Sequence, residues 1–251
     1  MPKFFVEPSQ IYDEEVLIFG DDAHHITSSL RMKIGDPITV CNMNKRDYDC
    51  IISSVSGGII HAEIISSSIC EAEPDYSITV YQCLPKGDKM EYVIQKAVEL
   101  GASSIVPVLS SRCIAKPSGY DKNGKDKKSD RYSRIAYEAA EQSGRGIVPV
   151  VHDCISFERA VELAKSDAIS FICYEDEKQN GIRKFIASKK NEGMKNNSIS
   201  FFIGPEGGFS PEEISHAKEN GIESVGLGNR ILRTETASGF VLSVLSYETE
   251  L

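Results

Sequence analysis

The fold of this chain is decided by two stretches near its end, Phe201-Phe202-Ile203-Gly204-Pro205-Glu206-Gly207-Gly208-Phe209-Ser210 and Leu227-Gly228-Asn229-Arg230-Ile231-Leu232-Arg233-Thr234-Glu235-Thr236-Ala237. Each begins with an apolar, strand-like run, breaks at glycines and leads into a strong helix signal. Two such turns can bring backbone N–H and C=O groups to one ligand without side chains between them. This is the usual construction of a small-molecule or cofactor site in an α/β domain.

The first stretch also carries the signals of a helix start. Ser210 can cap the helix, Pro211 fits its first turn, and Glu213 completes a Ser-x-x-Glu capping box. Gly207 and Gly208 allow positive φ angles and a close approach by another chain or a ligand. A tight connection without any ligand would explain one such turn. The second turn, which follows soon after and is rich in Arg, Thr and Glu, favours a ligand site.

Composition indicates an ordinary globular protein. With 251 residues, 41% of them hydrophobic and 26% charged, the chain can form one large domain or two modest ones with a proper core. We find no apolar run long enough to span a membrane and no leader of the signal-peptide kind, so we expect a cytoplasmic location and no membrane partner. The seven cysteines are scattered and lack Cys-x-x-Cys spacing, so we expect neither a disulfide framework nor a metal site.

The net charge of −9 argues at first sight against a nucleic-acid partner. The charge is unevenly spread, however. Residues 1–75 contain five Lys and Arg against thirteen Asp and Glu, whereas residues 86–145 contain twelve against eight. A local basic surface can bind phosphates even on an acidic protein, because screening confines the interaction to about 10 Å. Charge alone therefore does not exclude RNA.

The first part of the chain reads mostly as strands, with one short helix at 22–32. The strands are expected at 4–6, 16–19, 38–41, 48–55 and 59–65. Gly57-Gly58, between the last two, is a hairpin signal. We therefore expect a small β-barrel or a strongly bent sheet, with a domain boundary in the polar, proline-containing segment 71–75.

Beyond this boundary strands alternate with helices, which implies a mostly parallel sheet covered by helices. Helices are expected at 89–100, 129–143, 157–165 and 182–190, and strands at 78–84, 105–109 and 168–174. The last helix is expected to carry one apolar stripe made of Ala237, Phe240, Val241, Val244 and Leu245, with Leu242 outside it. The polar stretch 117–130, with four lysines, predicts an exposed loop, for which simple solvation and a contact with RNA both stay open.

Taken together, these motifs resemble a known family. The two C-terminal stretches look like the signatures of the RsmE family, which are ribosomal RNA methyltransferases of the SPOUT class. The resemblance extends over much of the chain and in the expected order, through Lys86-Gly87-Asp88-Lys89-Met90, Gln95 to Gly101, Glu138 to Arg145, and His24-His25 with Leu30-Arg31-Met32.

The resemblance implies a fold and a reaction. The fold would be a PUA-like β-barrel RNA-binding domain at 1–73, followed at 74–251 by a SPOUT α/β-knot domain with a mostly parallel sheet and a deep trefoil knot. The reaction would be S-adenosylmethionine-dependent methylation of N3 of one uridine in 16S ribosomal RNA of the small subunit, by a metal-independent homodimer. Sequence pattern alone would have predicted an ordinary doubly wound sheet, because knots are rare.

The resemblance implies a cofactor at the C-terminal turns, and the absence of two common motifs is consistent with this. The chain lacks both the Gly-x-Gly-x-x-Gly of dinucleotide enzymes and the Gly-Lys-Ser/Thr of a P-loop. Backbone groups around Leu227, Ile231 and Leu232 are candidates for the adenine, with these side chains as walls, although plain core packing would also explain them. The full set predicted to bind the cofactor is Gly204, Pro205, Glu206, Gly207, Gly208, Leu227, Gly228, Ile231, Leu232 and Thr236.

Methylation of uracil N3 needs help mainly at the acceptor, because N3 carries a proton at neutral pH. A positioned base can contribute roughly 10²–10⁴-fold. We expect Glu206 to accept this proton and Arg233 to stabilise negative charge on O2 or O4 of the base. Alternatively, Glu206 holds a loop through backbone hydrogen bonds, and Arg233 pairs with Glu235 or with a phosphate.

RNA contacts are expected from both parts of the chain. The resemblance points to the first helix, and arginines near the site could hold phosphates. The predicted set is His24, His25, Arg31, Arg112, Arg131, Arg134, Gln142 and Arg145. For the histidine pair a partly buried structural role is the alternative. Two other functions are alternatives: a non-catalytic RNA-binding protein of the SPOUT fold, and a SPOUT methyltransferase acting on tRNA or on a ribose 2′-hydroxyl.

Overall fold

The computed structural model describes residues 1–117, 128–191 and 198–250. The chain divides into two compact units, one made of Met1–Glu73 and Ala140–Val148, the other of Pro74–Ala139 and Pro149–Leu251. The sequence-based ranges 1–73 and 74–251 thus need one amendment, because the segment 140–148 returns to the first unit. Most of the expected loop 117–130 lies outside the described residues.

The first unit is built on one five-stranded sheet. Its strands are β1 (Lys3–Phe5), β2 (Glu15–Ile18), β3 (Pro37–Cys41), β4 (Arg46–Ser56) and β5 (Ile59–Ile69), in the order β1-β3-β4-β5-β2. All neighbours are antiparallel except β1 and β3, which are parallel. The expected hairpin between β4 and β5 is present, and its glycines, Gly57 and Gly58, have φ angles of +59° and +80° that match the twist of a tight two-residue turn.

A short helical segment packs on this sheet. The turn of 3-10 helix Pro8–Gln10 precedes β2, and α1 (Asp21–His24) continues into a π-helical turn, His25–Ser29. The expected helix 22–32 therefore ends earlier than its apolar pattern suggests, and Arg31, with φ of +55°, lies beyond it in a left-handed conformation. Ala23 and Ile26 of this segment join the apolar core, which the sheet supplies with Val16, Ile18, Ile38, Val40, Ile52 and Ile60.

The second unit contains a seven-stranded sheet in which all neighbouring strands run parallel. The strands are β6 (Ser77–Cys83), β7 (Ser104–Leu109), β8 (Val150–Val151), β9 (Ile155–Ser156), β10 (Ile169–Cys173), β11 (Ser198–Ile203) and β12 (Glu223–Val225). Their order is β12-β10-β11-β6-β7-β8, and β9 also pairs with β7. The predicted parallel sheet is confirmed, whereas β8 and β9, at two residues each, are too short to leave a pattern in sequence.

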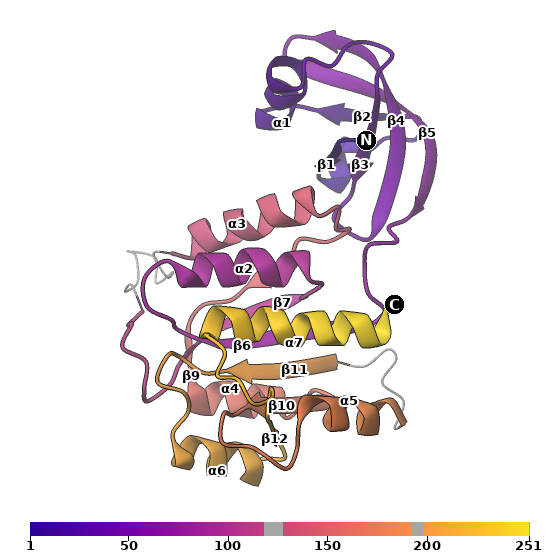
Figure 1. Ribbon diagram of the computed structural model, residues 1–251. Helices are drawn as coiled ribbons and strands as arrows, with labels where there is room; N and C mark the ends of the chain where they lie inside the picture. Colours follow the sequence, from indigo (N-terminus) through magenta and orange to yellow (C-terminus); the bar gives the residue numbers. More distant parts are fainter. Residues whose placement is uncertain (118–127, 192–197, 251) are drawn as a thin grey trace. The chain divides into compact units, whose positions relative to one another are not determined.

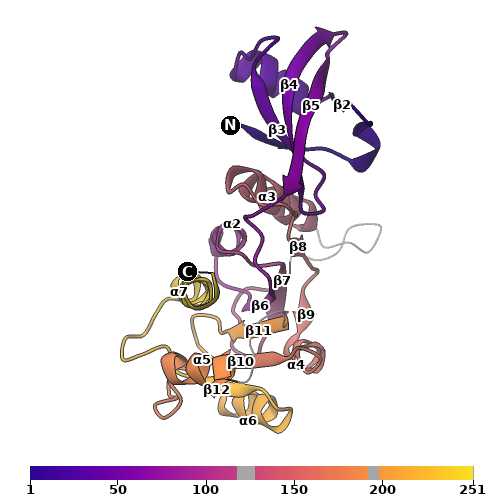
Figure 2. The same ribbon diagram turned by 90° about the vertical axis from the view of Figure 1, so that its right-hand side faces the viewer.

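Helices cover both faces of this sheet (Figures 1 and 2). One face packs against α4 (Phe157–Ala164) and α6 (Pro211–Glu219), around the stacked rings of Tyr81 and Phe202. The other face carries α2 (Lys89–Glu99), α5 (Ile182–Asn191) and α7 (Thr234–Thr249), with Phe171 between Phe185 and Phe201. The remaining helix, α3, spans Ser129–Gln142.

The last helix has apolar residues on more than one side. Leu242, outside the apolar stripe read from the sequence, is 0% exposed, while Phe240, within that stripe, is 36% exposed. The helix lies beside α2 on the sheet and buries more than one side, so a single stripe does not describe it. The trefoil knot implied by the family resemblance stays a prediction, because strand order and pairing do not report how the chain is threaded.

Candidate active site

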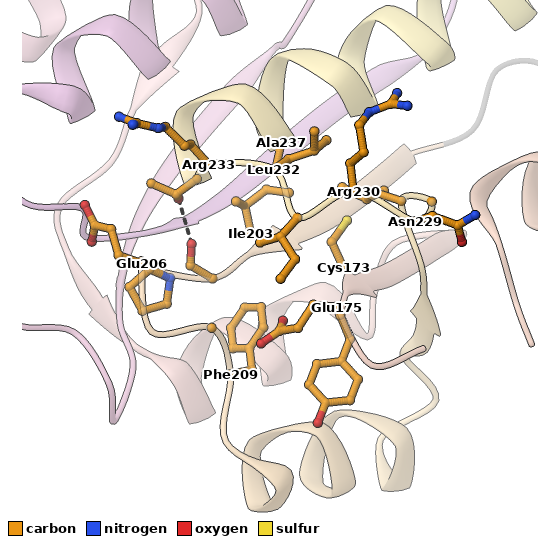
Figure 3. A pocket seen from close by; sticks show the side chains of 18 of the residues that line it. Cys173, Glu175, Ile203, Glu206, Phe209, Asn229, Arg230, Leu232, Arg233 and Ala237 are labelled. Atoms are coloured by element: carbon orange, nitrogen blue, oxygen red, sulfur yellow. Dashed lines mark hydrogen bonds between the residues drawn. The ribbon is translucent and has the colours of Figure 1, made fainter. Parts of the chain in front are cut away.

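A pocket opens at the carboxyl ends of β10, β11 and β12 (Figure 3). Its cavity volume of about 440 Å³ lies in the usual range of small-molecule sites. Cys173 ends β10, Ile203 ends β11, and Leu227 follows shortly after β12; all three line the cavity. Ligands of open parallel sheets bind at this edge. Every lining residue belongs to the second unit.

The first glycine turn follows β11 and forms one wall of the pocket. Gly208 has a φ of +64°, and its N–H donates to the Pro205 carbonyl oxygen at 2.9 Å. A Cβ on Gly204 would lie 3.2 Å from the Gly208 Cα, so the turn is tight where both side chains are absent. The predicted capping box is confirmed: Ser210 Oγ accepts from the Glu213 N–H at 3.2 Å, and Glu213 Oε2 accepts from the Ser210 N–H at 2.9 Å.

The second stretch contains backbone groups without hydrogen-bond partners among the described residues. Within the described part of the chain, none of the backbone N–H or C=O groups of residues 227–232 takes part in a hydrogen bond. Backbone polar groups in folded proteins are normally paired with protein or water, so an unpaired run beside a cavity is available to a ligand. Just before it, Gly226 lies so close to the loop after β10 that a Cβ would be 2.2 Å from the Glu177 carbonyl oxygen. This contact holds the start of the open segment in place.

A buried chain of hydrogen bonds joins the two stretches. Gln82, which comes from β6 and is 0% exposed, donates from Nε2 to Thr234 Oγ1 at 2.8 Å. Thr234 Oγ1 in turn donates to the Gly204 carbonyl oxygen at 2.7 Å. The start of α7 is therefore anchored both to the middle of the sheet and to the first glycine turn.

Most residues predicted to bind the cofactor do line this pocket: Gly204, Pro205, Glu206, Gly208, Leu227, Gly228, Ile231 and Leu232. Gly207 and Thr236 are not among the lining residues. The Gly207 carbonyl oxygen accepts from Arg112 Nη1 at 3.0 Å, and the Thr236 N–H donates to the Arg233 carbonyl oxygen in the first turn of α7. Ile231 is 88% exposed, which rules out plain core packing as its role.

Glu206 lies on the first turn and is held by hydrogen bonds. Its Oε1 accepts from the Lys86 N–H and from Lys89 Nζ, each at 3.1 Å. Burial acts to raise the pKa of Glu206, but hydrogen bonds from its own backbone N–H, from Lys86 and from Lys89 outweigh burial, so the pKa lies below the ordinary value. The carboxylate is thus ionised at neutral pH and only weakly basic.

Lys89 connects this carboxylate with a second one. Its Nζ lies 3.2 Å from Glu235 Oε2, a buried oxygen that has no hydrogen-bond partner among the described residues. The hydrogen bond to Glu206, together with the Glu235 charge, raises the pKa of Lys89. Glu235 therefore faces Lys89 and not Arg233. Arg233 is exposed and lines the pocket from the N-cap position of α7. It forms no ion pair with any described residue.

Sequence reasoning missed several lining residues. They come mainly from the loop after β10 and from the starts of α2 and α7: Lys89, Cys173, Tyr174, Glu175, Lys178, Phe209, Asn229, Arg230, Thr234 and Ala237. One signal could have found the first group. The run 168–174 was predicted as a parallel strand, and residues just after such a strand lie at the edge where ligands bind.

The arginines predicted to contact RNA in the second unit are on its surface. Arg131 is 62% exposed at its side chain and pairs with Glu91 at 2.7 Å, and Arg134 is 78% exposed and pairs with Glu138 at 3.1 Å. Arg112 is also exposed and contacts the first glycine turn through Gly207. Exposed ion pairs of this kind are weak, so these guanidinium groups can exchange a carboxylate for a phosphate.

The predicted RNA contacts in the first unit divide into two groups. His24, His25, Arg31 and Gln142 are exposed. The His25 ring also lies edge-on to the ring of the buried Phe4, with 6.3 Å between centroids, so it contributes to packing as well. Arg145 is a correction. Its side chain is 3% exposed and its Nε and Nη2 donate to the Glu73 carboxylate at 2.8 and 3.0 Å, so it holds the segment 140–148 against the first unit and is not accessible to a phosphate.

None of the helices in the described ranges has both the length and the apolar character needed to cross a membrane. Over the same residues, no group of three or more His, Cys, Asp or Glu side chains could hold a metal ion.

Comparison with known proteins identifies the family. Residues 72–246 match the model of an RNA methyltransferase domain, and residues 19–65 match that of an RNA methyltransferase PUA domain. The chain is 35% identical over 254 aligned residues to ribosomal RNA small subunit methyltransferase E of Bacillus subtilis, covering 100% of this chain and 98% of the relative. It is 29% identical to the protein of the same name from Synechocystis, covering 97% of this chain and 77% of the relative.

A solved structure agrees with this assignment. The ribosomal RNA small subunit methyltransferase E of Neisseria gonorrhoeae, bound to S-adenosyl methionine, superposes with a TM-score of 0.81 at 28% identity, covering 98% of this chain and 97% of that one. The family implied by the sequence motifs and the fold class, an N-terminal PUA domain before an α/β domain with a parallel sheet, are both confirmed. The chain therefore belongs to the RsmE family of ribosomal RNA small subunit methyltransferases.

Proposed function

We propose that this protein uses S-adenosylmethionine to methylate N3 of a uridine in 16S ribosomal RNA of the small subunit. The names of its relatives in Bacillus and Synechocystis support the substrate, and the cofactor bound to the Neisseria relative supports the methyl donor. The observation that carries the proposal is the pocket itself. It is bordered by the segment 227–232, whose backbone groups have no hydrogen-bond partner among the described residues. It is also lined by two arginines, Arg230 and Arg233, that form no ion pair with those residues.

The residues present fit this cofactor. The open backbone of 227–232 offers donors and acceptors to an adenine ring, while Leu227 and Leu232 are half-buried apolar walls. Gly204 and Gly208 lack the side chains that would fill the opposite wall. When bound, S-adenosylmethionine supplies an electrophilic methyl group on a sulfonium. The protein must then position the acceptor nitrogen in line with it and exclude water.

We assign the main catalytic role to Arg233. As N3 loses its proton, negative charge spreads to the neighbouring carbonyl oxygens, and an exposed guanidinium beside the pocket is free to stabilise it. Removing one such donor typically costs about 10²–10³-fold in rate. In this role Arg233 acts on the reacting base itself, because Glu235 is already bound to Lys89.

Glu206 is a weaker candidate for the base than its position suggests. It is ionised and so can accept a proton, but its lowered pKa reduces its basicity. We propose that Glu206 accepts the N3 proton while Arg233 stabilises the anion as it forms. The contacts with Lys86 and Lys89 hold the carboxylate at the pocket before it accepts the proton.

RNA would be held by exposed residues of both units. We propose phosphate contacts for Arg112, Arg131 and Arg134, and RNA docking for the exposed residues of the first unit, His24, His25, Arg31 and Gln142. Because phosphate contacts release counterions, substitution of any of these arginines should lower the salt dependence of RNA binding.

We further propose that the protein acts as a homodimer in the cytoplasm. On the face of the second unit that carries α2 and α7, three aromatic side chains are exposed: Tyr92 at 51%, Phe240 at 36% and Tyr247 at 67%. Aromatic residues on a surface are typical of interfaces. Sedimentation of the intact protein, compared with a Tyr92→Glu and Phe240→Glu double variant, tests this: a wild-type monomer would refute it.

The reaction is tested by methyl transfer from labelled S-adenosylmethionine to small subunits that lack the modification, followed by mass spectrometry of the nucleosides. We expect 3-methyluridine, and a loss of about 10²–10³-fold in kcat for Arg233→Gln. Arg183→Gln, on the exposed side of α5, is the matched control and should retain activity. Methylation of another RNA or of a ribose hydroxyl would replace the proposed substrate, and RNA binding without any transfer would favour a non-catalytic protein.

A further inference from the structure

The pocket contains a carboxylate to which the proposed reaction gives no role. Glu175 lies in the loop just after β10 and lines the cavity. Its side chain points inward, toward the ring of Phe209 on the opposite turn (Figure 3). Asp176 and Glu177, which follow it in sequence, are not among the lining residues. One carboxylate of this acidic run is therefore set apart from the others by its position.

The first glycine turn makes room for this carboxylate. A Cβ built on Gly208 would lie 2.3 Å from Glu175 Oε1 and 3.1 Å from its Oε2. Both oxygens therefore occupy the space that any side chain at position 208 would need. The turn that shapes the pocket and the carboxylate inside it are fitted to each other.

The carboxylate of Glu175 also lacks a cation. Within the described ranges of the chain, neither of its oxygens forms an ion pair or a hydrogen bond. The nearby Lys178 donates its ammonium to the main-chain carbonyl oxygen of Glu175, at 2.7 Å. Four cations line the pocket, Lys89, Lys178, Arg230 and Arg233, and among the described residues none of them forms an ion pair with the Glu175 carboxylate. Lys89 is bound to Glu206 and faces Glu235 instead. Glu175 is exposed at the pocket, and its carboxylate, without a cation among these residues, can pair with a positively charged ligand group.

We propose that Glu175 is the subsite that binds the positive charge of the methyl donor. This inference rests on the proposed function, because it takes S-adenosylmethionine as the ligand of the pocket. The donor carries two positive groups, a sulfonium and an α-ammonium, and either can face a carboxylate. Methyl transfer turns the sulfonium into a neutral thioether and leaves the ammonium unchanged. If Glu175 faces the sulfonium, its attraction disappears with the reaction, and release of the product becomes easier.

The test measures binding by calorimetry, without RNA and without turnover. The wild type and Glu175→Gln are titrated with S-adenosylmethionine, with S-adenosylhomocysteine and with adenosine, which carries neither charged group. We expect Glu175→Gln to weaken binding of S-adenosylmethionine about tenfold, equivalent to about 1.4 kcal/mol. Adenosine binding should not change. Asp176→Asn is the matched control: it removes a neighbouring charge that accepts a hydrogen bond from Tyr174 and does not line the pocket, and it should leave all three affinities unchanged.

The three ligands separate the possible outcomes. A loss confined to S-adenosylmethionine assigns Glu175 to the sulfonium, and an equal loss for S-adenosylhomocysteine assigns it to the ammonium. An unchanged affinity for both, or an equal loss for adenosine, overturns the proposal. If the wild type binds neither charged ligand, the proposed function itself fails, together with this inference. Thermal unfolding of Glu175→Gln should match the wild type, since the carboxylate has no partner in the described protein to lose.

Discussion

Removal of Glu73 should unfold the first unit far more easily than its single negative charge suggests. Glu73 Oε1 accepts from Arg145 Nε at 2.8 Å, from the Gly146 N–H at 2.7 Å and from the Ile147 N–H at 3.2 Å, while Oε2 accepts from Arg145 Nη2 at 3.0 Å. Both charged side chains are 3% exposed. Glu73→Ala leaves a buried guanidinium without its counter-charge, which costs about 3–5 kcal/mol.

Urea denaturation of the intact protein measures this effect. With a dependence of roughly 1–3 kcal/mol per molar urea, the midpoint should fall by about 1 M or more. Glu73→Gln should cost less than Glu73→Ala, because an amide oxygen can still accept from the two backbone N–H groups. The control is Glu162→Ala, which breaks an exposed ion pair with Arg159 (side chains 64% and 55% exposed) and should cost under about 1 kcal/mol.

One result would refute this reasoning. If Glu73→Ala were no more destabilising than Glu162→Ala, the pair would not be buried in solution, and Arg145 would again be available to RNA. If the reasoning holds, loss of methylation in an Arg145 variant reports the stability of the protein and not a missing phosphate contact.

Three further predictions concern the second unit. Lys89→Met should raise the pKa of Glu206, because burial acts to raise this pKa and Lys89 acts to lower it. A carboxyl NMR titration would detect the change. An unchanged pKa would mean that the backbone donors alone keep the pKa of Glu206 low. The ionised Glu206 stabilises the folded protein at pH values above the pKa that Glu206 has in the unfolded state. This contribution is lost as the pH falls through the lower pKa of the folded state. Because the variant has a higher folded-state pKa, it should lose the contribution at a higher pH. Gly208→Ala should weaken binding of S-adenosylmethionine, because the new methyl group displaces Glu175. The control is Gly58→Ala, which introduces the same backbone strain at a positive φ but has no atom within 4 Å of its new Cβ. It should leave binding of S-adenosylmethionine unchanged. Ser210→Ala should cost about 1 kcal/mol in thermal unfolding and Ser210→Gly only a few tenths, and equal costs would argue against the cap.

Local structure was predictable wherever one short stretch contains the whole signal. The capping box at Ser210 needs only Glu213, three residues on, and the hairpin at Gly57-Gly58 needs only positive φ at two adjacent residues. The alternation of strands with amphipathic helices likewise predicted the parallel sheet of the second unit. The stripe read on the last helix did not show which of its residues are buried, because its apolar residues contact both the sheet and a neighbouring helix.

The site was predictable only in part, because some of its residues are brought together by tertiary contacts and do not lie in one short stretch. Its two glycine-bearing stretches lie close together in sequence and were found. Lys89 and Glu206 are 117 residues apart, and their ion pair depends on α2 starting beside the turn that follows β11. Glu175 was missed because a carboxylate after a strand has no local pattern that distinguishes it from its neighbours Asp176 and Glu177.

By itself the sequence determined the fold class, the family and the pair of turns that form the pocket, because glycine placement, capping residues and hydrophobic period act over a few residues. Only the tertiary structure decided which charges meet. It buries Arg145 against Glu73 and pairs Lys89 with both Glu206 and Glu235. Among the described residues, it leaves Arg233 and Glu175 at the pocket without partners. The physical reason is that burial and charge pairing depend on the order of strands in the sheet, which brings together residues that are distant in sequence.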